Sequence, residues 1–408
     1  MNSYTPKAIH QPVSVAQALL PLLAEHADSA EVSGQMSAEV FDAIMGSGLF
    51  QFMFPRRAGG LGHPLITHTE TVAELAKADP GTAWAFGLLS SVTASVAAMP
   101  PMILEKVFLR GDELFCSVAA PTGTARPVKD GYLVNGRWSY ASGCMHADYA
   151  LNGLCILDDA GNSVSQGFAV IPLNLNPHAR IEITWQVAGV SASGSNTIVA
   201  DDLVVPHELV FDPLGHKKLA ANASADELAQ MQANAEPRDY WPKEPLFPLV
   251  VLSPMLGAAQ SLLEQVTAGM QSRPIIGWDF PSKTDSAVFV QQLGQSAMEI
   301  DSAWMHVRRA IADIDVTAQQ RTLSGFDKAR IQADCGHAMG LLRKATSRLM
   351  DIAGPGAFAS VSALQRLWRD LNVGSRHTYL SSPLSEELYG RALTGLNSTM
   401  INLADISV

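Results

Sequence analysis

Residues 135–146 read Asn135-Gly136-Arg137-Trp138-Ser139-Tyr140-Ala141-Ser142-Gly143-Cys144-Met145-His146, a strand-like run that ends in a Ser-Gly pair. Long helical patterns lie on both sides of this run. A hydroxyl at the end of a strand can face the edge of a bound cofactor, so Ser142 is the first candidate for a functional side chain. A tryptophan beside a small-residue turn is more often ordinary strand packing, and the segment therefore needs support from the rest of the chain.

The sequence pattern changes twice along the chain. Apolar residues recur at helical spacing over about 14–110, whereas short apolar runs separated by Gly, Asn, Asp and Pro occupy 114–212. A connector over 213–248 is followed by helical patterns at about 254–271, 285–319 and 326–352, the last ended by Gly354-Pro355-Gly356, and by a fourth from about Ser360. We predict an α+β protein with an N-terminal α-helical domain (1–113), a central antiparallel β-barrel or sandwich (114–212), and a linker with a C-terminal four-helix bundle (213–408).

Composition narrows the class of protein. The chain has 408 residues and is 47% hydrophobic, enough for a large core. Its net charge of −11 and pI near 5.4 argue against a nucleic-acid partner or a basic membrane surface. The four cysteines show no C-x-x-C spacing, so we expect free thiols, no disulfide framework and no metal site. The first residues lack the pattern of a signal peptide, and we expect a cytoplasmic protein.

The stretch from Pro80 to Leu104 contains no charged residue and is long enough to cross a bilayer. Its hydroxyl residues and the Pro100-Pro101 pair favour a buried helix of a large helical bundle instead. We therefore expect no membrane partner, and we expect the hydroxyls on this helix to line a pocket.

Four further segments occur in a fixed order around residues 135–146. They are Phe54–Gly62 with the spacing P-x-x-x-G-G-x-G, Asp79–Trp84, Trp185–Ser195 and Asp202–Pro206. Together with the W-S-x-x-S-G element that starts at Trp138, they resemble the acyl-CoA dehydrogenase superfamily, and in particular its branch of two-component flavin-dependent monooxygenases (group D). The resemblance implies an acyl-CoA dehydrogenase-like fold.

The resemblance also implies site residues. Ser142 would approach N5 of a flavin and act in catalysis, and Asp370 would lie in the substrate pocket. The remaining implied flavin contacts are Trp138, Gly143, Ser193, Gly194, Ser195 and Arg273, and the remaining implied pocket residues are Trp84, Ser91 and His146. The chain departs from the family pattern in two places: Ser191 stands where arginine is common, and Ser90-Ser91 stand where many aromatic hydroxylases carry a histidine.

The segment 364–377 bears on the chemistry. If one helix continues past Gly374, then Arg366, Asp370 and His377 share a face, with spacings of four and seven residues. In acyl-CoA dehydrogenases this stretch supplies a glutamate that abstracts a proton, but here the position holds His377, and no carboxylate follows until Glu386. A lone histidine on a helix is usually structural. The resemblance instead implies a catalytic histidine, and imidazole suits proton transfer near neutral pH.

The function implied by the resemblance is that of an oxygenase component. It would use reduced FAD or FMN (FADH2 or FMNH2) and O2, through a C4a-hydroperoxyflavin, to oxygenate a small aromatic substrate of the phenol or indole type. Because the chain lacks a G-x-G-x-x-G fingerprint, we expect a separate NAD(P)H:flavin reductase as partner. The long bundle helices and Arg273 imply a homotetramer or homodimer. Two alternatives remain open, an acyl-CoA dehydrogenase and a non-enzymatic helical scaffold.

Overall fold

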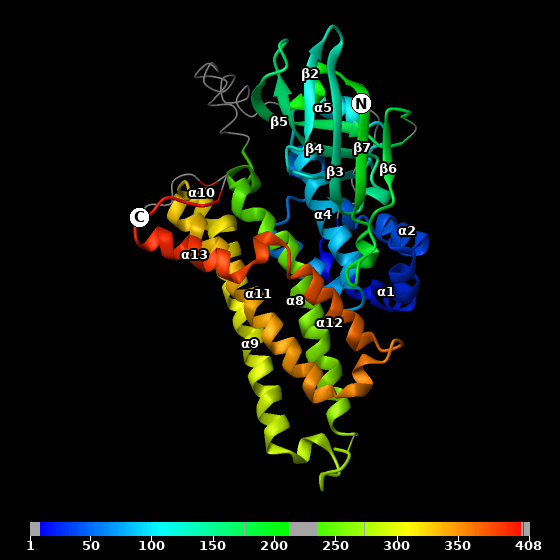
Figure 1. The fold of residues 1–408 in the computed structure, drawn as a ribbon, viewed down its shortest axis with the longest axis vertical. Helices are drawn as coiled ribbons and strands as arrows, with labels where there is room; N and C mark the ends of the chain where they lie inside the picture. The colour runs from blue at the N-terminus through cyan, green and yellow to red at the C-terminus, as the bar shows by residue number, and fades with distance from the viewer. Residues whose placement is uncertain (1–8, 175, 212–234, 273, 401–402, 404–408) are drawn as a thin grey trace.

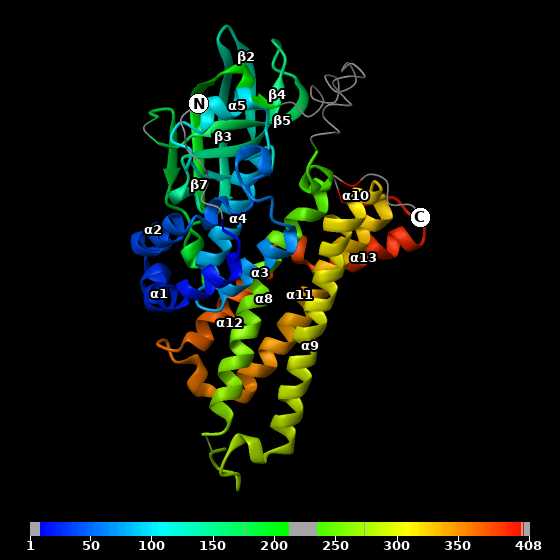
Figure 2. The same ribbon diagram turned by 180° about the vertical axis from the view of Figure 1, so that it is seen from behind.

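The computed structural model describes residues 9–174, 176–211, 235–272, 274–400 and 403. Figure 1 shows a β-sheet at one end of an elongated molecule, a helical bundle at the other end, and the N-terminal helices between them. Figure 2 shows α3 and α4 lying between the sheet and the bundle helix α8 from the opposite side. The three-part α–β–α organisation expected from the sequence is present.

The N-terminal part is helical, as predicted. Its α-helices are α1 (Pro12–Ser33), α2 (Ala38–Ser47), α3 (Leu65–Ala76), α4 (Pro80–Ala97) and α5 (Pro101–Val107). Asp79 caps α4, because its carboxylate accepts from Gly81 N at 3.0 Å and from Thr82 Oγ1 at 2.6 Å. The single uncharged helix expected over 80–104 is interrupted after Ala97, since Pro100 has no N–H to donate to the preceding turn.

The central part is one sheet of eight strands. They are β1 (Phe115–Cys116), β2 (Gly123–Val128), β3 (Gly131–Ala141), β4 (Tyr149–Leu157), β5 (Ser163–Pro172), β6 (Ala179–Glu182), β7 (Asn196–Val205) and β8 (Val210–Phe211). Strands β6-β7-β3-β2-β4-β5-β8 are neighbours in that order, and β1 pairs with β4. The sheet is open, so the predicted barrel is wrong.

The prediction of an antiparallel sheet is also wrong in part. Strands β2 and β3 form an antiparallel hairpin, and β7 occupies the other edge of β3. The next strand, β4, therefore pairs with the free edge of β2 and runs parallel to it. Strand β1 is also parallel to β4, and the result is a mixed sheet.

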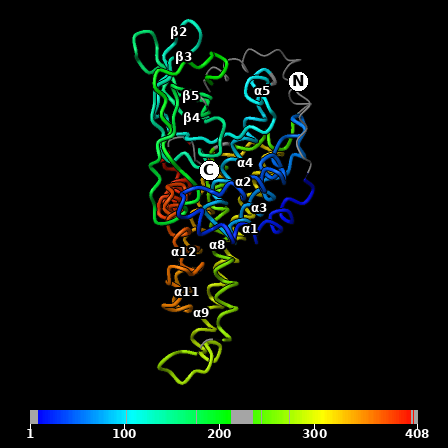
Figure 3. The backbone as a smooth tube through the Cα atoms, turned by 90° about the vertical axis from the view of Figure 1, so that its right-hand side faces the viewer, coloured from blue at the N-terminus to red at the C-terminus, as the bar shows by residue number. Residues whose placement is uncertain are grey.

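The C-terminal part contains the bundle, whose helices lie side by side in Figure 3. Its helices are α8 (Lys243–Met270), α9 (Ala287–Ala312), α10 (Ala318–Gln320), α11 (Gly325–Ala353), α12 (Ala363–Gly374) and α13 (Ser382–Leu393). Gly354, at φ 82°, ends α11 as its sequence predicted. Within the described residues, the one helix apolar and long enough to cross a membrane is α8, and 78% of its most apolar window is buried inside the fold. The four cysteines are free.

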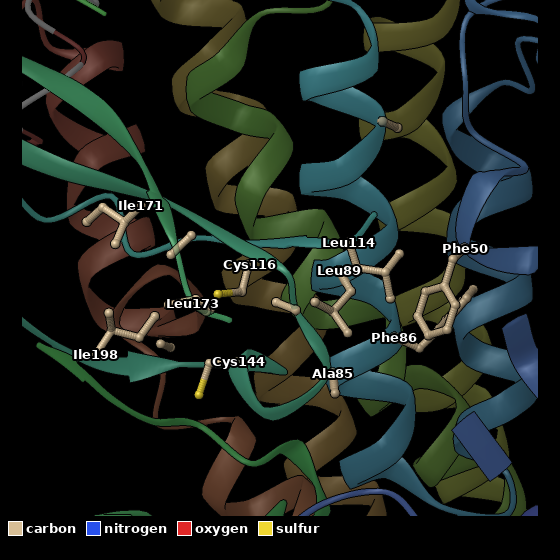
Figure 4. Packing of buried hydrophobic residues seen from close by; sticks show 14 of the residues in the cluster. Phe50, Ala85, Phe86, Leu89, Leu114, Cys116, Cys144, Ile171, Leu173 and Ile198 are labelled. Atoms are coloured by element: carbon tan, nitrogen blue, oxygen red, sulfur yellow. The ribbon is translucent and has the colours of Figure 1, made fainter. Parts of the chain in front are cut away.

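The helix α4 connects the cores of the N-terminal and central parts. Figure 4 shows Phe86 and Leu89 of α4 between Phe50 on one side and, on the other, Ile171 of the sheet and Cys144 of the turn after β3. All five side chains are buried. Residues at the N-terminal end of α4 are thereby fixed next to the end of β3, where Ser142 lies.

A carboxylate from the bundle caps α3. The helix begins after Pro64, which has no capping side chain. Asp315, from a π-helical turn (Asp313–Thr317) at the end of α9, accepts from Leu65 N at 2.9 Å and from Ile66 N at 3.2 Å. Two N–H groups that a helix leaves unpaired at its start are thus satisfied by a residue about 250 positions later in the chain.

Candidate active site

A chain of three serine hydroxyls follows the end of β3. Ser142 Oγ lies 2.7 Å from Ser195 Oγ, which lies 2.8 Å from Ser193 Oγ. The indole N–H of Trp84 donates to Ser142 Oγ at 3.2 Å. Gly143, at φ 75°, turns the chain so that its N–H donates to Ser193 O at 2.8 Å. Three segments distant in sequence therefore meet at Ser142, and they bring together Ser142, Ser193 and Ser195, which the resemblance implies as flavin contacts.

The hydroxyl chain leaves one donor unused. Three serines carry three hydroxyl protons, and the two Oγ–Oγ contacts use two of them. The third proton is available to an acceptor outside the chain, and Ser142 is the most exposed of the three at 8%. A flavin ring edge offers nitrogen and oxygen acceptors, so this part of the structure fits the group that the sequence resemblance implies.

The loop that carries Ser193 is held by α12. Asp370 accepts from Val190 N at 2.6 Å, and Val190 has φ 50°, a conformation that costs a β-branched residue energy. A Cβ on Gly189 would lie 2.6 Å from Arg369 O, so only glycine allows this close approach of loop and helix. Asp370 thus positions the loop, and its observed contact is with backbone and not with a substrate pocket.

Burial, followed by the nearby carboxylate of Asp79, raises the pKa of Asp370 to about 8. The Val190 N–H opposes this increase because it stabilises the ionised form. Burial is also the first cause of the raised pKa of Asp79. The two carboxyl groups therefore lie close together between α4 and α12, in a region where ionising both is unfavourable.

His377 lies beyond the end of α12. The helix ends at Gly374, so the continuous face expected to carry Arg366, Asp370 and His377 does not form. A Cβ on Gly374 would lie 3.1 Å from the Trp84 ring and closer still to Met255, which shows how tightly this turn packs. The chain reverses here, and His377 becomes the N-terminal cap of a short 3-10 turn (Thr378–Leu380).

The imidazole of His377 lies among aromatic rings. Its centroid is 6.1 Å from that of Trp84, 5.4 Å from Phe247 and 5.8 Å from Tyr379. Burial lowers the pKa of His377 to about 4, so the ring is neutral at pH 7. The Tyr379 N–H donates to Nδ1 at 3.3 Å, which places the ring proton on Nε2. His377 therefore offers a hydrogen-bond donor near Trp84, the residue whose indole N–H bonds to Ser142, and its protonated Nε2 has no free lone pair to accept a further proton.

The remaining predicted site residues have different positions. Trp138 has no exposed surface, and its indole N–H donates to Gly153 O at 2.6 Å within the sheet core, so its predicted contact with a cofactor is corrected to a packing role. His146 stacks on Phe41 of α2 at 4.8 Å. Gly194 is in the left-handed conformation between Ser193 and Ser195. Arg273 lies outside the described residues.

A small cavity of about 10 Å³ lies beside the middle of α4, the helix whose hydroxyls were expected to line a pocket. Its lining residues are Met53, Leu65, His68, Ser91, Ala94, Ser95, Arg238, Trp241 and Leu246. Ser91, which was predicted to lie in the substrate pocket, is one of these lining residues. A histidine is also present next to Ser90, because His68 Nε2 of α3 lies 3.1 Å from Ser90 Oγ. No sequence pattern indicated that α3 brings an imidazole to this part of α4.

Comparison with known proteins gives the class to which this arrangement belongs. Residues 14–100 match the family model of the acyl-CoA dehydrogenase N-terminal domain, and residues 249–382 match that of the acyl-CoA dehydrogenase C-terminal domain. The chain belongs to the acyl-CoA dehydrogenase family.

Within this family, similar proteins are oxygenases. The chain is 26% identical to the "flavin-dependent monooxygenase, oxygenase subunit HsaA" of Rhodococcus jostii, over 94% of this chain and 98% of that protein. It is also 26% identical to the "p-hydroxyphenylacetate 3-hydroxylase, oxygenase component" of Acinetobacter baumannii, over 93% and 88%. A solved structure of XiaF from Streptomyces sp., in complex with FADH2 and glycerol, has a TM-score of 0.87 and 28% identity, covering 95% of this chain and 96% of that chain.

Proposed function

We propose that this chain is the oxygenase component of a two-component flavin-dependent monooxygenase that oxygenates a small aromatic substrate. The observation that carries the proposal is the spare donor of the serine chain, located where Trp84 and His377 also meet. The relatives support the reaction class, since they are oxygenase components and cover nearly the whole chain. Reduced FAD or FMN, when bound, supplies the electrons with which one atom of O2 enters the substrate and the other becomes water.

Ser142 holds the flavin edge in this proposal. Its hydroxyl proton is free for a flavin acceptor once Ser193 and Ser195 have used theirs between themselves and Ser142. The Trp84 N–H fixes the orientation of Ser142 Oγ. Asp370 and Gly189 hold the loop that carries Ser193 and Ser195. The Ser142 hydroxyl is therefore already oriented, and little reorganisation of the protein is needed when the flavin binds.

His377 orients the substrate. Its Nε2–H donates to an oxygen of the aromatic substrate, and the hydrogen bond from Tyr379 N keeps the ring in this tautomer. The surrounding rings of Trp84 and Phe247 exclude water, which would otherwise promote loss of peroxide before oxygen transfer. A phenol or an indole has the flat apolar shape that such rings contact well.

The acyl-CoA dehydrogenase alternative is disfavoured by the chemistry at this position. That reaction requires a carboxylate base, whereas the site has neutral His377. Asp370 is bound to Val190 N, and Glu386, the next carboxylate in the sequence, is exposed on α13. The helical-scaffold alternative gives no reason for a buried hydroxyl chain with a spare donor.

The proposal includes a separate NAD(P)H:flavin reductase and a cytoplasmic homo-oligomer without nucleic-acid or membrane partners. Exposed apolar side chains at the far end of the bundle and along α9 support self-association. These are Ile276, Trp278, Val288, Val290, Met298 and Met305. Light scattering at micromolar concentration should give a dimer or tetramer, and a monomer would contradict this part of the proposal.

The function is tested by product analysis. The chain would be mixed with photochemically reduced FAD or FMN, ¹⁸O2 and a panel of phenols and indoles, and products would be identified by mass spectrometry. Incorporation of one ¹⁸O atom per product molecule is expected. If the chain instead forms an enoyl product from an acyl-CoA without O2, or yields no product with any aromatic substrate, the proposal is wrong.

A further inference from the structure

The side-chain amide of Gln332 joins α11 to the turn that follows His377. Gln332 is 5% exposed, and its Nε2 donates to Tyr379 O at 2.7 Å and to Ser385 Oγ at 2.9 Å. A backbone carbonyl only accepts, so the amide atom that faces Tyr379 is the nitrogen, and both of its N–H groups are used. Gln332 therefore binds the 3-10 turn (Thr378–Leu380) and α13 at the same time.

Burying this amide has a cost. The Oε1 atom of Gln332 has no hydrogen-bond partner among the residues that the structure describes, and a buried acceptor without a donor destabilises the fold. A methionine at this position would have nearly the same length and no amide to satisfy. Packing of α11 alone therefore gives no reason for a glutamine here, whereas the two hydrogen bonds that it donates do.

The contact between α13 and α11 does not depend on Gln332 alone. Ser382 Oγ of α13 donates to Gly336 O of α11 at 2.6 Å. A Cβ on Gly336 would clash with Ser385 Oγ, which shows that the two helices are closely packed at this point. The helix α13 thus has its own contacts with α11, and the hydrogen bond to Tyr379 O is the part of the Gln332 bridge that concerns the reaction site.

Tyr379 links Gln332 to His377. The Tyr379 N–H donates to His377 Nδ1 at 3.3 Å, a distance slightly beyond the usual range, so a displacement of a few tenths of an ångström would break this bond. Leu380 N donates to His377 O at 2.8 Å and closes the turn, but this bond does not hold Tyr379. Because the bond to Nδ1 determines which ring nitrogen carries the proton, the position of Tyr379 decides whether Nε2 is a donor.

We propose that Gln332 is a positioning residue for His377: it holds the carbonyl of Tyr379, and this keeps the Tyr379 N–H on Nδ1 and the ring proton on Nε2. Gln332 acts through Tyr379 and not by contact with flavin or substrate. Its importance for oxygenation rests on the proposed function, in which the Nε2–H of His377 orients the substrate.

The first test observes the imidazole of His377 in the flavin-free chain at pH 7. Histidine would be labelled with ¹⁵N, and two-dimensional NMR would correlate the ring nitrogens with the carbon-bound ring protons, since protonated and bare nitrogens have well-separated shifts. The signal that is missing from His377→Ala identifies the residue. Gln332→Met removes both hydrogen bonds, and the matched control, Ser385→Ala, leaves the bond from Gln332 to Tyr379 O in place.

In the wild type, Nε2 of His377 should be the protonated nitrogen. Gln332→Met should raise the ratio of Nδ1–H to Nε2–H rings roughly 2-fold to 10-fold, the range expected for loss of one hydrogen bond, and Ser385→Ala should not. A wild-type ring protonated on Nδ1, no change in Gln332→Met, or an equal change in Ser385→Ala would overturn the proposal. If Gln332→Met does not fold, Gln332→Asn takes its place, because its amide is one methylene too short to reach Tyr379 O.

The second test separates positioning of His377 from a general structural effect. Gln332→Met should lower the rate of ¹⁸O-labelled product formation roughly 2-fold to 10-fold, but should have no effect in a chain that already carries His377→Ala. Equal slowing in both backgrounds would show that Gln332 does not act through His377. If the wild type forms no oxygenated product, the proposed reaction is wrong, and the NMR comparison still decides whether Gln332 positions His377.

Discussion

Replacing Asp370 tests whether α12 holds the serine loop through a neutral carboxyl group. With a pKa of about 8, Asp370 is mostly protonated at pH 7, and an asparagine side chain at this position would have the same shape and charge. We expect Asp370→Asn to keep the acceptor for Val190 N and to change the free energy of unfolding at pH 7 by less than about 1 kcal/mol. Asp370→Ala leaves the buried Val190 N–H unpaired and should lose about 1–3 kcal/mol.

The free energy of unfolding should also depend on pH, and the expected change can be calculated from the raised pKa of Asp370. The folded state keeps a proton on Asp370 that the unfolded state releases near its ordinary pKa, so the stability contributed by this group is present at low pH and is lost as the pH rises towards 8. At about 1.4 kcal/mol per pH unit, with the group half-ionised at pH 8, the wild type should lose about 2 kcal/mol between pH 6 and 8. Asp370→Asn should not show this loss.

The assay is urea unfolding of the wild type and both variants at pH 6, 7 and 8, followed by tryptophan fluorescence. Other titrating groups are shared by the wild type and the asparagine variant, so the difference between these two chains isolates residue 370. If that difference stays constant across the pH range, Asp370 is not protonated in the folded state as proposed. If the asparagine and alanine variants are equally destabilised at pH 7, the hydrogen bond from Val190 N to residue 370 does not hold the serine loop.

Two further predictions concern the proposed reaction. Ser142→Ala should release more of the consumed O2 as hydrogen peroxide, while flavin affinity changes less than tenfold. The control is Ser139→Ala, because Ser139 lies on β3 and outside the serine chain; unchanged peroxide release in Ser142→Ala would remove Ser142 from the site. His377→Ala should lower the rate of product formation roughly 10-fold to 100-fold, whereas substitution of the exposed His178 should not. Because the pKa of His377 is about 4, the wild-type rate should show no inflection from this group between pH 6 and 9, and an acidic limb near pH 6.5 that is absent from the variant would contradict the assigned neutral state.

The sequence was informative where structure is determined locally. Asp79 before α4 and Gly354 after α11 are end signals that depend only on nearby backbone. Gly354 ends α11 as expected, and Asp79 caps α4. Ser142, Ser193 and Ser195 were identified through a resemblance that fixes positions in the fold, and they do form a connected chain.

Features that depend on distant contacts were not predictable from the pattern. The prolines Pro248 and Pro254 suggested a late start for α8, yet packing in the bundle maintains the helix from Lys243. The sheet is open because its terminal strands, β6 and β8, do not pair with each other, and such long-range pairing is not encoded in strand-like runs. The Nε2–H donor of His377 depends on the Tyr379 N–H, a detail of the turn after Gly374.

Asp315 of the bundle caps α3 of the N-terminal part. The domains predicted from the sequence are therefore not independent folding units. A fragment comprising residues 1–113 would start α3 with unpaired N–H groups, and a fragment comprising the bundle would expose a carboxylate whose pKa burial otherwise raises. Helix α3 also carries His68 into the pocket beside α4. The stability of the start of α3, and with it the position of His68, therefore depends on a carboxylate that the bundle contributes about 250 residues later in the chain.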